Sequence, residues 1–312
     1  MRSNYSKENL SQLIKIKAKS LGFYVCGIAA AEPVSGIEQQ FYKNWITKGY
    51  QADMSYLAKH FEKRMDPTLL VPGTKSVIAV ALNYYPDHQI PSTEYQLAWY
   101  AYGRDYHLLM REKMNLLFDY IHSLVPIAGR VFCDTAPVLD RYWAWKAGLG
   151  WIGKNTQLII PKAGPTFFLG ELFIDIELNY DTPQKSRCGR CTKCLESCPT
   201  KALEQAYTLN SKRCISYQTI ENRGDICSSI LPLLKNKIYG CDDCIKSCPW
   251  LRFAQPSQES SLQISKSLLS MTRDKWHELS VEEYRALFPK SAVKRAKYEG
   301  LVRNIKAVRE HS

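Results

Sequence analysis

The first 180 residues alternate between segments with a helical hydrophobic pattern and segments with a strand-like one. Apolar side chains recur at helical spacing from Asn9 to Ser20, which predicts a helix, and Gly22 stands where that helix is expected to end. Residues 23–29 and 76–82 are short runs of β-forming apolar side chains, so we predict two buried strands there. A long amphipathic helix is predicted from Tyr106 to Leu124.

The same alternation continues to a polar boundary. We predict a short strand over residues 130–133, a helix after Pro137 through Ala147, and strands near residues 156–160 and 167–176. Strands that alternate with helices favour a layered α/β core. Residues 181–187 are polar and contain Pro183, so we place the boundary to a second domain there.

The composition indicates a soluble protein with an excess of basic residues. With 312 residues and 45% hydrophobic side chains, the chain can bury a substantial core. No apolar run reaches the length of a membrane span, so we expect no membrane association. The 42 Lys and Arg residues outnumber the 30 Asp and Glu residues, which gives a formal net charge of +12.

Much of this basic excess lies near the C-terminus. Between residues 290 and 312 the acidic residues are Glu299 and Glu310, and the basic residues are Lys290, Lys294, Arg295, Lys297, Arg303, Lys306 and Arg309. A solvated basic helix and a surface that follows nucleic-acid phosphates explain this segment about equally well.

Eight of the eleven cysteines fall in two closely spaced runs and one linking position. The first run reads CGRCTKCLESCP from Cys188, and the second reads CDDCIKSCP from Cys241. In a C-x2-C-x2-C-x3-C-P run, three thiolates bind one 4Fe-4S cluster and the last cysteine binds a neighbouring cluster. The second run lacks one position, which Cys214 can supply. We therefore predict one cluster on Cys188, Cys191, Cys194 and Cys248, and a second on Cys198, Cys214, Cys241 and Cys244.

Two other uses of these cysteines fit the sequence less well. Structural zinc sites also use C-x2-C pairs, but they need neither a third cysteine three residues on nor the Cys-Pro endings at Pro199 and Pro249. Disulfide frameworks belong to oxidising compartments, whereas this N-terminus opens with a polar stretch and shows no signal segment, so we expect a cytoplasmic protein. The remaining cysteines, Cys26, Cys133 and Cys227, are interpreted as small buried hydrophobic residues.

The clusters are expected to serve another site, because a free-standing electron carrier would not need the long region that precedes them. The segment from Phe132 to Asn155 is the most informative part of that region. Asp134 closes an apolar strand, and taken alone it is interpreted as a helix N-cap. The following glycine-rich loop, GLGWIGKN, allows a ligand to approach the backbone closely, but its spacing is not that of a phosphate-binding P-loop.

Several motifs together resemble epoxyqueuosine reductase. They are PGTKSVIAVAL at residues 72–82, YGRDYH at 102–107, DTAPVLDR at 134–141, GLGWIGKN at 148–155 and RCISY at 213–217, joined to the double cysteine run. The resemblance extends from the N-terminal helix to about Arg303. It implies an oxidoreductase that uses cobalamin and two 4Fe-4S clusters to reduce the epoxide of epoxyqueuosine, at the wobble position of a tRNA anticodon, to queuosine. This reaction is the last step of queuosine biosynthesis.

The resemblance also implies an α+β fold in three parts. Residues 1–180 would form a layered α/β cobalamin-binding catalytic domain, and residues 181–255 a ferredoxin-like domain with both clusters. Residues 256–312 would form a short basic helical segment packed on the catalytic domain. Many family members continue into helical repeats, whereas this chain stops soon after RNIKA at residues 303–307. We expect the basic segment to provide more of the tRNA contact here, or the affinity for tRNA to be lower.

Site residues can be transferred from the family onto matching positions. Asp134 is implied to be the proton donor, and the apolar flank from Val131 to Cys133 is expected to disfavour its carboxylate and hold a proton near neutral pH. The implied cobalamin contacts are Arg64, Asp134, Leu158, Leu169 and Ser216, with Lys154 and Asn155 as further candidates. The resemblance implies no protein ligand to cobalt. His107 is better explained as a histidine at a helix start than as a cobalt ligand, and together with Tyr106 it could border the substrate.

The partners follow from the same resemblance. We expect a monomer that binds tRNA carrying epoxyqueuosine and receives electrons from an external one-electron donor of the ferredoxin or flavodoxin type. An unpaired anticodon base can be splayed out and stacked on aromatic side chains. Trp143, Trp145 and Trp151 are nevertheless interpreted as core residues.

Two rival functions remain open. A reductive dehalogenase would use cobalamin and two clusters in the same way, but that family typically carries a twin-arginine export signal, which residues 1–10 lack. It also tends to use a tyrosine as proton donor. A ferredoxin-type electron-transfer protein would need only the cluster domain and would leave the large α/β region without a role.

Overall fold

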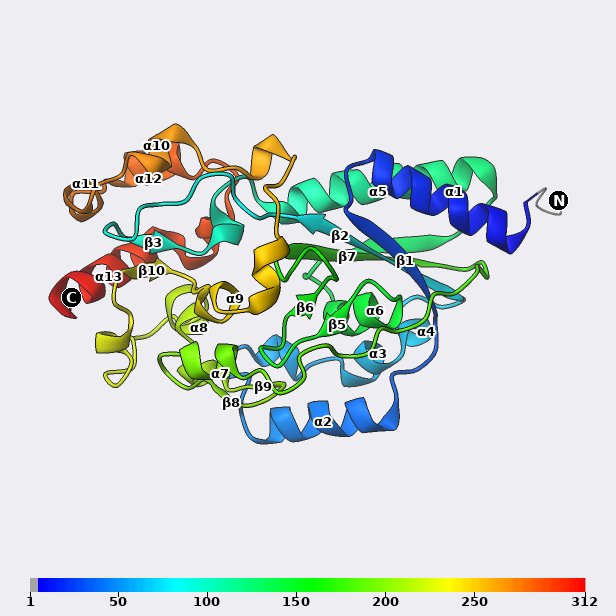
Figure 1. Cartoon of the computed structure of the whole chain (residues 1–312), viewed down its shortest axis with the longest axis horizontal. Helices are drawn as coiled ribbons and strands as arrows, with labels where there is room; N and C mark the ends of the chain where they lie inside the picture. Colours follow the sequence, from blue (N-terminus) through cyan, green and yellow to red (C-terminus); the bar gives the residue numbers. More distant parts are fainter. Residues whose placement is uncertain (1–4, 312) are drawn as a thin grey trace.

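The computed structural model describes residues 5–311 (Figure 1). Residues 1–4, on which part of the export-signal argument rests, and Ser312 at the end of the basic segment lie outside the described residues. The central sheet has the strand order β1-β2-β7-β4, and every neighbouring pair in it is antiparallel. Its strands are β1 (Val25–Ala30), β2 (Ser76–Asn83), β4 (Gly129–Phe132) and β7 (Phe167–Ile174).

Helices cover both faces of this sheet, which confirms the predicted layered α+β architecture (Figure 1). One face carries α1 (Lys7–Ser20) and α5 (Tyr106–Leu124), and the other carries α6 (Asp140–Lys146). The predicted helix from Tyr106 to Leu124 is confirmed at both ends. Alternating strands and helices often build a parallel sheet, but the sheet strands here pair in opposite directions, so the core is α+β rather than parallel α/β.

Two glycines let the helices approach the sheet closely. A Cβ atom on Gly27 of β1 would lie 2.0 Å from the carbonyl oxygen of Ala147, which directly follows α6. A Cβ atom on Gly170 of β7 would lie 2.6 Å from Sδ of Met114 on α5. The backbone oxygen near Gly27 cannot move aside, so this position requires glycine for α6 to pack closely on the sheet, whereas the Met114 side chain near Gly170 is flexible.

Shorter elements make up the rest of the described chain. The first half adds α2 (Gly36–Thr47), α3 (Phe61–Met65), α4 (Pro67–Leu70), β3 (Gln96–Leu97), β5 (Trp151–Ile152) and β6 (Leu158–Ile159). The cysteine-rich region adds α7 (Lys193–Ser197), β8 (Leu203–Gln205), β9 (Thr208–Leu209), α8 (Ile215–Ile220), β10 (Lys237–Tyr239) and α9 (Asp243–Lys246). The last region adds α10 (Lys266–Leu269), α11 (Arg273–His277), α12 (Val281–Leu287) and α13 (Lys297–His311). The 3-10 helices are η1 (Ser55–Leu57), η2 (Trp99–Ala101), η3 (Ser211–Arg213), η4 (Leu231–Leu233), η5 (Pro249–Phe253), η6 (Ser260–Leu262) and η7 (Ala292–Ala296).

The C-terminal helix α13 packs on the cysteine-rich region. Asn304 of α13 is fully buried, and its amide donates to the carbonyl oxygens of Thr219 and Ile238, both at 2.8 Å. Arg303 donates to the carbonyl oxygens of Gln218 and Asn222. The last segment therefore contacts residues 181–255 as well as the first part of the chain, and one hydrophobic core runs through all three predicted parts. The domain boundaries stay a prediction.

In the described part of the chain, no helix combines the length and the apolar character that crossing a membrane requires.

Candidate active site

Asp134 lies on a loop between β4 and α6, not at a helix start. Helix α6 begins at Asp140 with Leu139 as its N-cap, so the N-cap interpretation of Asp134 is wrong. The backbone of Asp134 has φ = +58°, a left-handed conformation that aspartate tolerates better than most residues. Its N–H donates to Oδ1 of Asp140 at 3.3 Å, and its side chain is 61% exposed. The loop therefore presents the carboxylate outward.

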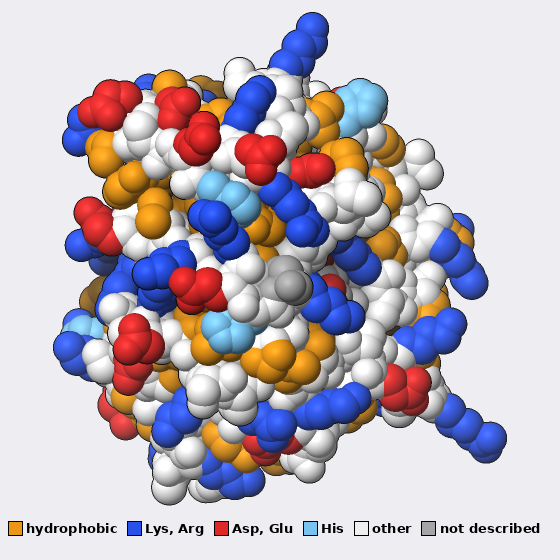
Figure 2. Space-filling view, turned by 90° about the vertical axis from the view of Figure 1, so that its left-hand side faces the viewer, with side chains coloured by type: hydrophobic (Ala, Val, Ile, Leu, Met, Phe, Trp, Pro, Cys, Tyr) orange, Lys and Arg blue, Asp and Glu red, His pale blue; other side chains and the backbone are white. Residues whose placement is uncertain are grey.

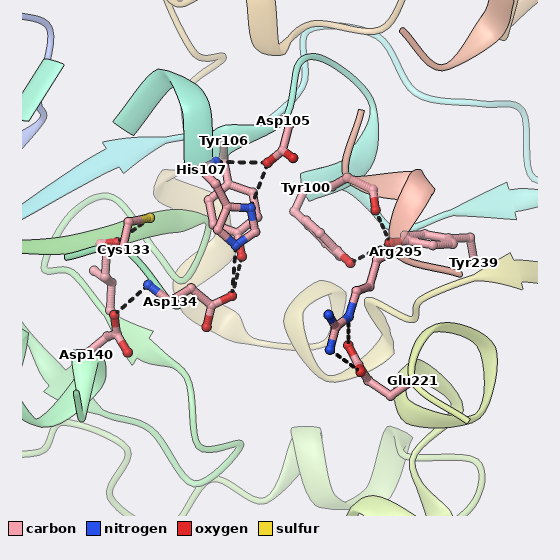
Figure 3. Close-up of polar contacts among 12 residues, drawn as sticks. Tyr100, Asp105, Tyr106, His107, Cys133, Asp134, Asp140, Glu221, Tyr239 and Arg295 are labelled. Carbon is pink, nitrogen blue, oxygen red and sulfur yellow. Dashed lines mark hydrogen bonds and ion pairs between the residues drawn. The ribbon is translucent and has the colours of Figure 1, made fainter. Parts of the chain in front are cut away.

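The N-terminus of α5 supplies the partners of this carboxylate (Figure 3). Tyr106 donates its hydroxyl to Oδ2 of Asp134 at 2.6 Å, and Nε2 of His107 lies 3.4 Å from the same oxygen. The other ring nitrogen of His107, Nδ1, lies 2.7 Å from Oδ1 of Asp105. Asp105 is also the N-cap of α5, because it accepts the backbone N–H of His107. His107 thus stands at a helix start, as expected, but it also bridges two carboxylates.

These contacts reverse the expected protonation of Asp134. Its carboxyl has a lowered pKa, because His107 and Tyr106 donate hydrogen bonds to it and His107 adds a favourable charge. The expectation that an apolar flank keeps a proton on Asp134 near neutral pH is therefore wrong. Burial opposes the charge on His107, but the hydrogen bonds to Asp105 and Asp134 outweigh it and raise the pKa of His107 to about 9. At neutral pH the proton therefore sits on His107.

Stacked rings hold this group in place. The ring of Tyr106 stacks on Phe168 of β7 with centroids 4.2 Å apart, and on His107 with centroids 4.0 Å apart. Burial and the negative charge of Asp134 raise the pKa of Tyr106 well above its ordinary value, so its hydroxyl stays a donor. Tyr106 and His107 therefore approach Asp134 from one rigid platform.

A buried acidic pair lies behind the Asp134 loop. Glu171 of β7 is fully buried, and neither of its carboxyl oxygens has a hydrogen-bond partner of good geometry among the described residues. Burial and the neighbouring charge of Asp140 raise the pKa of Glu171 well above its ordinary value, so its environment favours the protonated form. Burial and the charge of Asp134 also raise the pKa of Asp140, to about 6. Neither acid was identified from the sequence.

An ion pair lies across from Asp134 in the same view (Figure 3). Arg295 of η7 holds Glu221 in a bidentate contact, with Nε–Oε1 and Nη2–Oε2 distances of 2.8 and 2.7 Å. The negative charge of Asp134 is among the causes that raise the pKa of Arg295, after its contact with Glu221. In the sequence, Arg295 stands out only as one member of the basic segment.

The basic segment is partly occupied by internal contacts. Arg295 and Arg303 bind Glu221 and backbone carbonyl oxygens, as described above. Figure 2 shows the face at the C-terminal end of the molecule, where Lys and Arg side chains lie scattered among acidic and apolar ones and do not form one continuous basic area. The tRNA role of this segment stays a prediction.

The predicted cobalamin contacts come from several elements. Arg64 of α3 is buried rather than a surface residue: it donates to the carbonyl oxygens of Tyr56 at 3.2 Å and Val138 at 3.4 Å, while its Nε has no partner among the described residues. Leu158 and Leu169 belong to one hydrophobic cluster. The same cluster contains Met65, which follows Arg64 in the chain, and Val138, which follows the Asp134 loop. Ser216 is the second residue of helix α8. The four residues lie on four different elements, α3, β6, β7 and α8, and their contact with cobalamin stays a prediction.

Lys154 and Asn155, on the loop between β5 and β6, contact the cysteine loops through their side chains. The ammonium group of Lys154 donates to the carbonyl oxygens of Gly189 and Cys191, at 2.8 and 3.0 Å. The side-chain amide of Asn155 donates to the carbonyl oxygen of Cys244 at 3.1 Å. Both residues therefore contact the cysteine-rich region, and their predicted contact with cobalamin stays untested.

The cysteines fall into two spatial groups. Cys188, Cys191, Cys194 and Cys248 line one cavity of about 210 Å³ with Lys154, Asn155, Ile159, Arg187, Pro249 and Trp250. Burial raises the pKa of Cys248, and the other three thiols of that cavity raise it further. Cys244 is partly exposed, and its pKa is raised by desolvation and by Cys241, Cys214 and Cys198. These neighbours place the cysteines in the same two groups of four, and their role as cluster ligands stays a prediction. Cys227, by contrast, is exposed, so its interpretation as a buried hydrophobic residue is wrong.

Comparison with known proteins identifies the family. Residues 64–135 match the family model "Epoxyqueuosine reductase QueG, DUF1730", and residues 187–251 match the model "4Fe-4S double cluster binding domain". The epoxyqueuosine reductase of Cellulophaga algicola is 42% identical over 301 residues, which cover 96% of this chain and 98% of that protein. The corresponding protein of Leadbetterella byssophila is 43% identical, with coverage of 98% and 99%. The chain belongs to the epoxyqueuosine reductase family.

Solved structures support the same assignment. A crystal structure of epoxyqueuosine reductase with an epoxyqueuosine-modified tRNA-Tyr stem loop has a TM-score of 0.89 and 29% identity, and the match covers 97% of this chain and 82% of that one. The Bacillus subtilis enzyme, at 28% identity, was solved with an aspartate-bearing catalytic loop swung out of its active site. The reductive dehalogenase NpRdhA shares the fold only, with a TM-score of 0.53 and 14% identity. The protein is therefore an oxidoreductase of the epoxyqueuosine reductase family with a double 4Fe-4S cluster domain.

Proposed function

We propose that this protein reduces the epoxide of epoxyqueuosine in the anticodon loop of tRNA to queuosine, using cobalamin and two 4Fe-4S clusters. The observation that carries the proposal is the Asp134 site: an exposed carboxylate on a loop, bound by Tyr106 and His107, in a chain of this family. Arg64, Leu158, Leu169 and Ser216 would hold cobalamin. When bound, cobalamin supplies a cobalt centre that reaches a low oxidation state, and the clusters supply electrons one at a time.

The residues present fit these groups. Two quartets of thiols have the ligand number of a 4Fe-4S cluster, and one quartet lines a cavity. For cobalamin, whose corrin ring is flat and fringed with amides, the proposed contacts offer apolar surface from two leucines and hydrogen-bond donors from Ser216 and Arg64. The buried Nε of Arg64, which has no partner among the described residues, is a donor available for such an amide.

The chain's own residues handle the proton. Asp134 would deliver a proton to the epoxide oxygen as the C–O bond of the epoxide breaks. Its carboxyl group is the acid of the Tyr106–His107–Asp134 cluster, and its side chain is more exposed than that of His107. Tyr106 keeps the carboxylate oriented through its 2.6 Å hydrogen bond. The oxygen then leaves as water. A loop that carries the catalytic aspartate also has precedent in the Bacillus subtilis enzyme, where it was seen swung out.

We further propose that the protein acts as a monomer in the cytoplasm and takes electrons from a ferredoxin- or flavodoxin-type donor near the first cysteine run. Lys185, Arg187, Arg190 and Lys193 are exposed there, within and just before the run, and they would attract a small acidic redox protein. Because the substrate RNA is also acidic, reduction of the clusters and binding of tRNA need to be measured separately.

The test is conversion of epoxyqueuosine to queuosine in tRNA by the anaerobically reconstituted full chain, with and without cobalamin. We expect product only when cobalamin is present. Asp134→Ala should retain cobalamin, seen as an unchanged corrin absorbance band, and lose turnover by about 10²-fold or more. Asp119→Ala changes an exposed aspartate elsewhere on α5 and should behave like the wild type. Full activity of Asp134→Ala would exclude Asp134 as the proton donor, and activity without cobalamin would exclude the cofactor.

A further inference from the structure

The reaction needs more protons than Asp134 carries. Removal of the epoxide oxygen breaks two C–O bonds and forms one C=C bond, so each turnover consumes two electrons and two protons and releases one water molecule. The electrons come singly from the external ferredoxin- or flavodoxin-type donor. The lowered pKa of Asp134 leaves its carboxyl ionised at neutral pH, so Asp134 cannot be the store of either proton.

Tyr106 lies closest to the Asp134 carboxylate, but its raised pKa keeps the proton on its hydroxyl. The neighbouring group that can exchange a proton is His107. Its Nε2 lies 3.4 Å from Oδ2 of Asp134, and its Nδ1 lies 2.7 Å from Oδ1 of Asp105 (Figure 3). This ring is therefore held between two carboxylates, one exposed toward the site and one fixed at the helix N-cap. The side chain of His107 is 27% exposed, so solvent can recharge it between proton transfers.

We propose that Asp105, His107 and Asp134 form a proton relay in which His107 stores the proton and Asp134 passes it to the leaving oxygen. The proposal rests on the proposed function, since it supplies the protons of that reaction. In each transfer, the N–H bond at Nε2 of His107 breaks and an O–H bond forms on Asp134. That proton then moves to the substrate oxygen, and His107 takes a new proton from water. Two such cycles supply the two protons of one turnover.

Asp105 is the positioning residue of this relay. Its carboxylate accepts from Nδ1, so the imidazole carries its transferable proton on Nε2, the nitrogen that faces Asp134. It also accepts the backbone N–H of His107 at 3.0 Å, which fixes the first turn of α5. The arrangement resembles a hydrolase triad in that one carboxylate orients a histidine while the opposite nitrogen exchanges the proton.

The charged groups in contact with His107 favour its protonated, cationic form. Asp105 and Asp134 contact the ring directly, and Tyr106 binds Asp134 from the same helix. The other groups around Asp134 are Cys133, Asp140, Arg141, Glu171, Tyr56, Tyr100, and Arg295 with its partner Glu221. Arg141 and Arg295 act on Asp134, whereas the groups that raise the pKa of His107 are the two carboxylates in contact with its ring.

The first test measures the charge of His107 without turnover. The full chain with reconstituted clusters and selectively labelled histidine is titrated by NMR, which is practical because the sequence contains six histidines. We expect one resonance, absent in His107→Gln, to titrate with a midpoint near 9. Asp105→Asn should lower that midpoint, and it keeps a good N-cap, so α5 should stay intact. A wild-type midpoint near 6.5, or an unchanged midpoint in Asp105→Asn, overturns the inference.

The second test measures the pH profile of a single turnover by the prereduced enzyme. We expect the wild-type rate to hold through neutral pH and to fall as pH rises through about 9, when His107 loses its proton. His107→Gln should lose about 10²-fold near pH 8, and its rate should rise toward acidic pH, where Asp134 itself becomes protonated. In Asp105→Asn the alkaline fall should move to lower pH.

The matched control is His122→Gln, because His122 lies on the same helix but bonds the carbonyl of Ile127 instead of the site. It should leave both the rate and the profile unchanged. If His107→Gln is slower by a constant factor at every pH, the side chain has only a structural role and the relay is excluded. A wild-type chain that fails to convert epoxyqueuosine contradicts the proposed function, whereas a wild-type His107 midpoint near 6.5 contradicts the relay whether or not the chain is active.

Discussion

The side-chain amide of Asn155 donates to the carbonyl oxygen of Cys244 at 3.1 Å. Asn155 also lines the cavity of the first cysteine quartet, whereas Cys244 belongs to the second. One buried side chain therefore ties together the loops of both proposed clusters, and only 2% of its surface is exposed. The glycine-rich loop at residues 148–155, where the sequence suggested the approach of a ligand, thus contacts the loops that carry the cysteines.

Removing this amide should loosen both cluster loops. Asn155→Ala leaves the carbonyl of Cys244 without its partner at a part-buried position, which we expect to cost about 1 kcal/mol of unfolding free energy. Anaerobic chemical denaturation of the reconstituted chain measures this cost, and iron content reports on the clusters. Asn115→Ala, an exposed asparagine on α5, is the control. Equal stability of the two variants would contradict the role of Asn155.

The ammonium group of Lys154 should raise the reduction potential of the first cluster. Its positive charge lies on the loop that carries Cys191 and favours the more negative, reduced cluster. Lys154→Met is expected to lower the potential by roughly 60 mV, equivalent to about 1.4 kcal/mol for one electron. A redox titration followed by EPR measures it, and Lys162→Met on an exposed position should leave it unchanged. An unaltered potential in Lys154→Met would show that the lysine acts only on loop geometry.

Glu171 should make the fold less stable as pH rises. Its pKa in the fold is raised by burial, so above the ordinary value of 4.5 the unfolded chain loses this proton while the folded chain keeps it. Stability should therefore fall with increasing pH above about 4.5. Glu171→Gln removes this dependence, so its advantage in Tm over the wild type should be absent near pH 4 and should grow toward pH 8. Parallel Tm curves of the two proteins would exclude a neutral Glu171.

Asn304 should be essential for docking α13. Its substitution by alanine leaves the carbonyls of Thr219 and Ile238 unpaired in the core, and we expect a loss of roughly 2–4 kcal/mol. Thermal unfolding of the full chain measures the loss. Lys306→Ala changes an exposed residue of the same helix and should have little effect. A similar small effect in both variants would mean that α13 is held by its apolar contacts alone.

Much of the fold and the cluster site could be predicted because the signals are local. The helix from Tyr106 to Leu124 has a continuous apolar stripe and Asp105 as its cap, so its limits could be predicted from the sequence. Cluster cysteines follow a recognisable spacing, because a cubane takes two or three of its ligands at set intervals along one loop. The antiparallel strand order, by contrast, depends on pairings between distant segments, which periodicity does not report.

The sequence by itself determined the chemical groups: two quartets of thiols, an aspartate after an apolar strand, and a family resemblance that the comparisons confirm. Only the tertiary structure decided where the proton sits. Tyr106 and Asp134 are 28 positions apart in the chain, yet they share a 2.6 Å hydrogen bond, and His107 reaches the same oxygen. The charge of a carboxyl depends on what lies within a few ångströms of it. The apolar neighbours of Asp134 in the sequence therefore predicted a raised pKa, whereas the contacts with the N-terminus of α5 lower it.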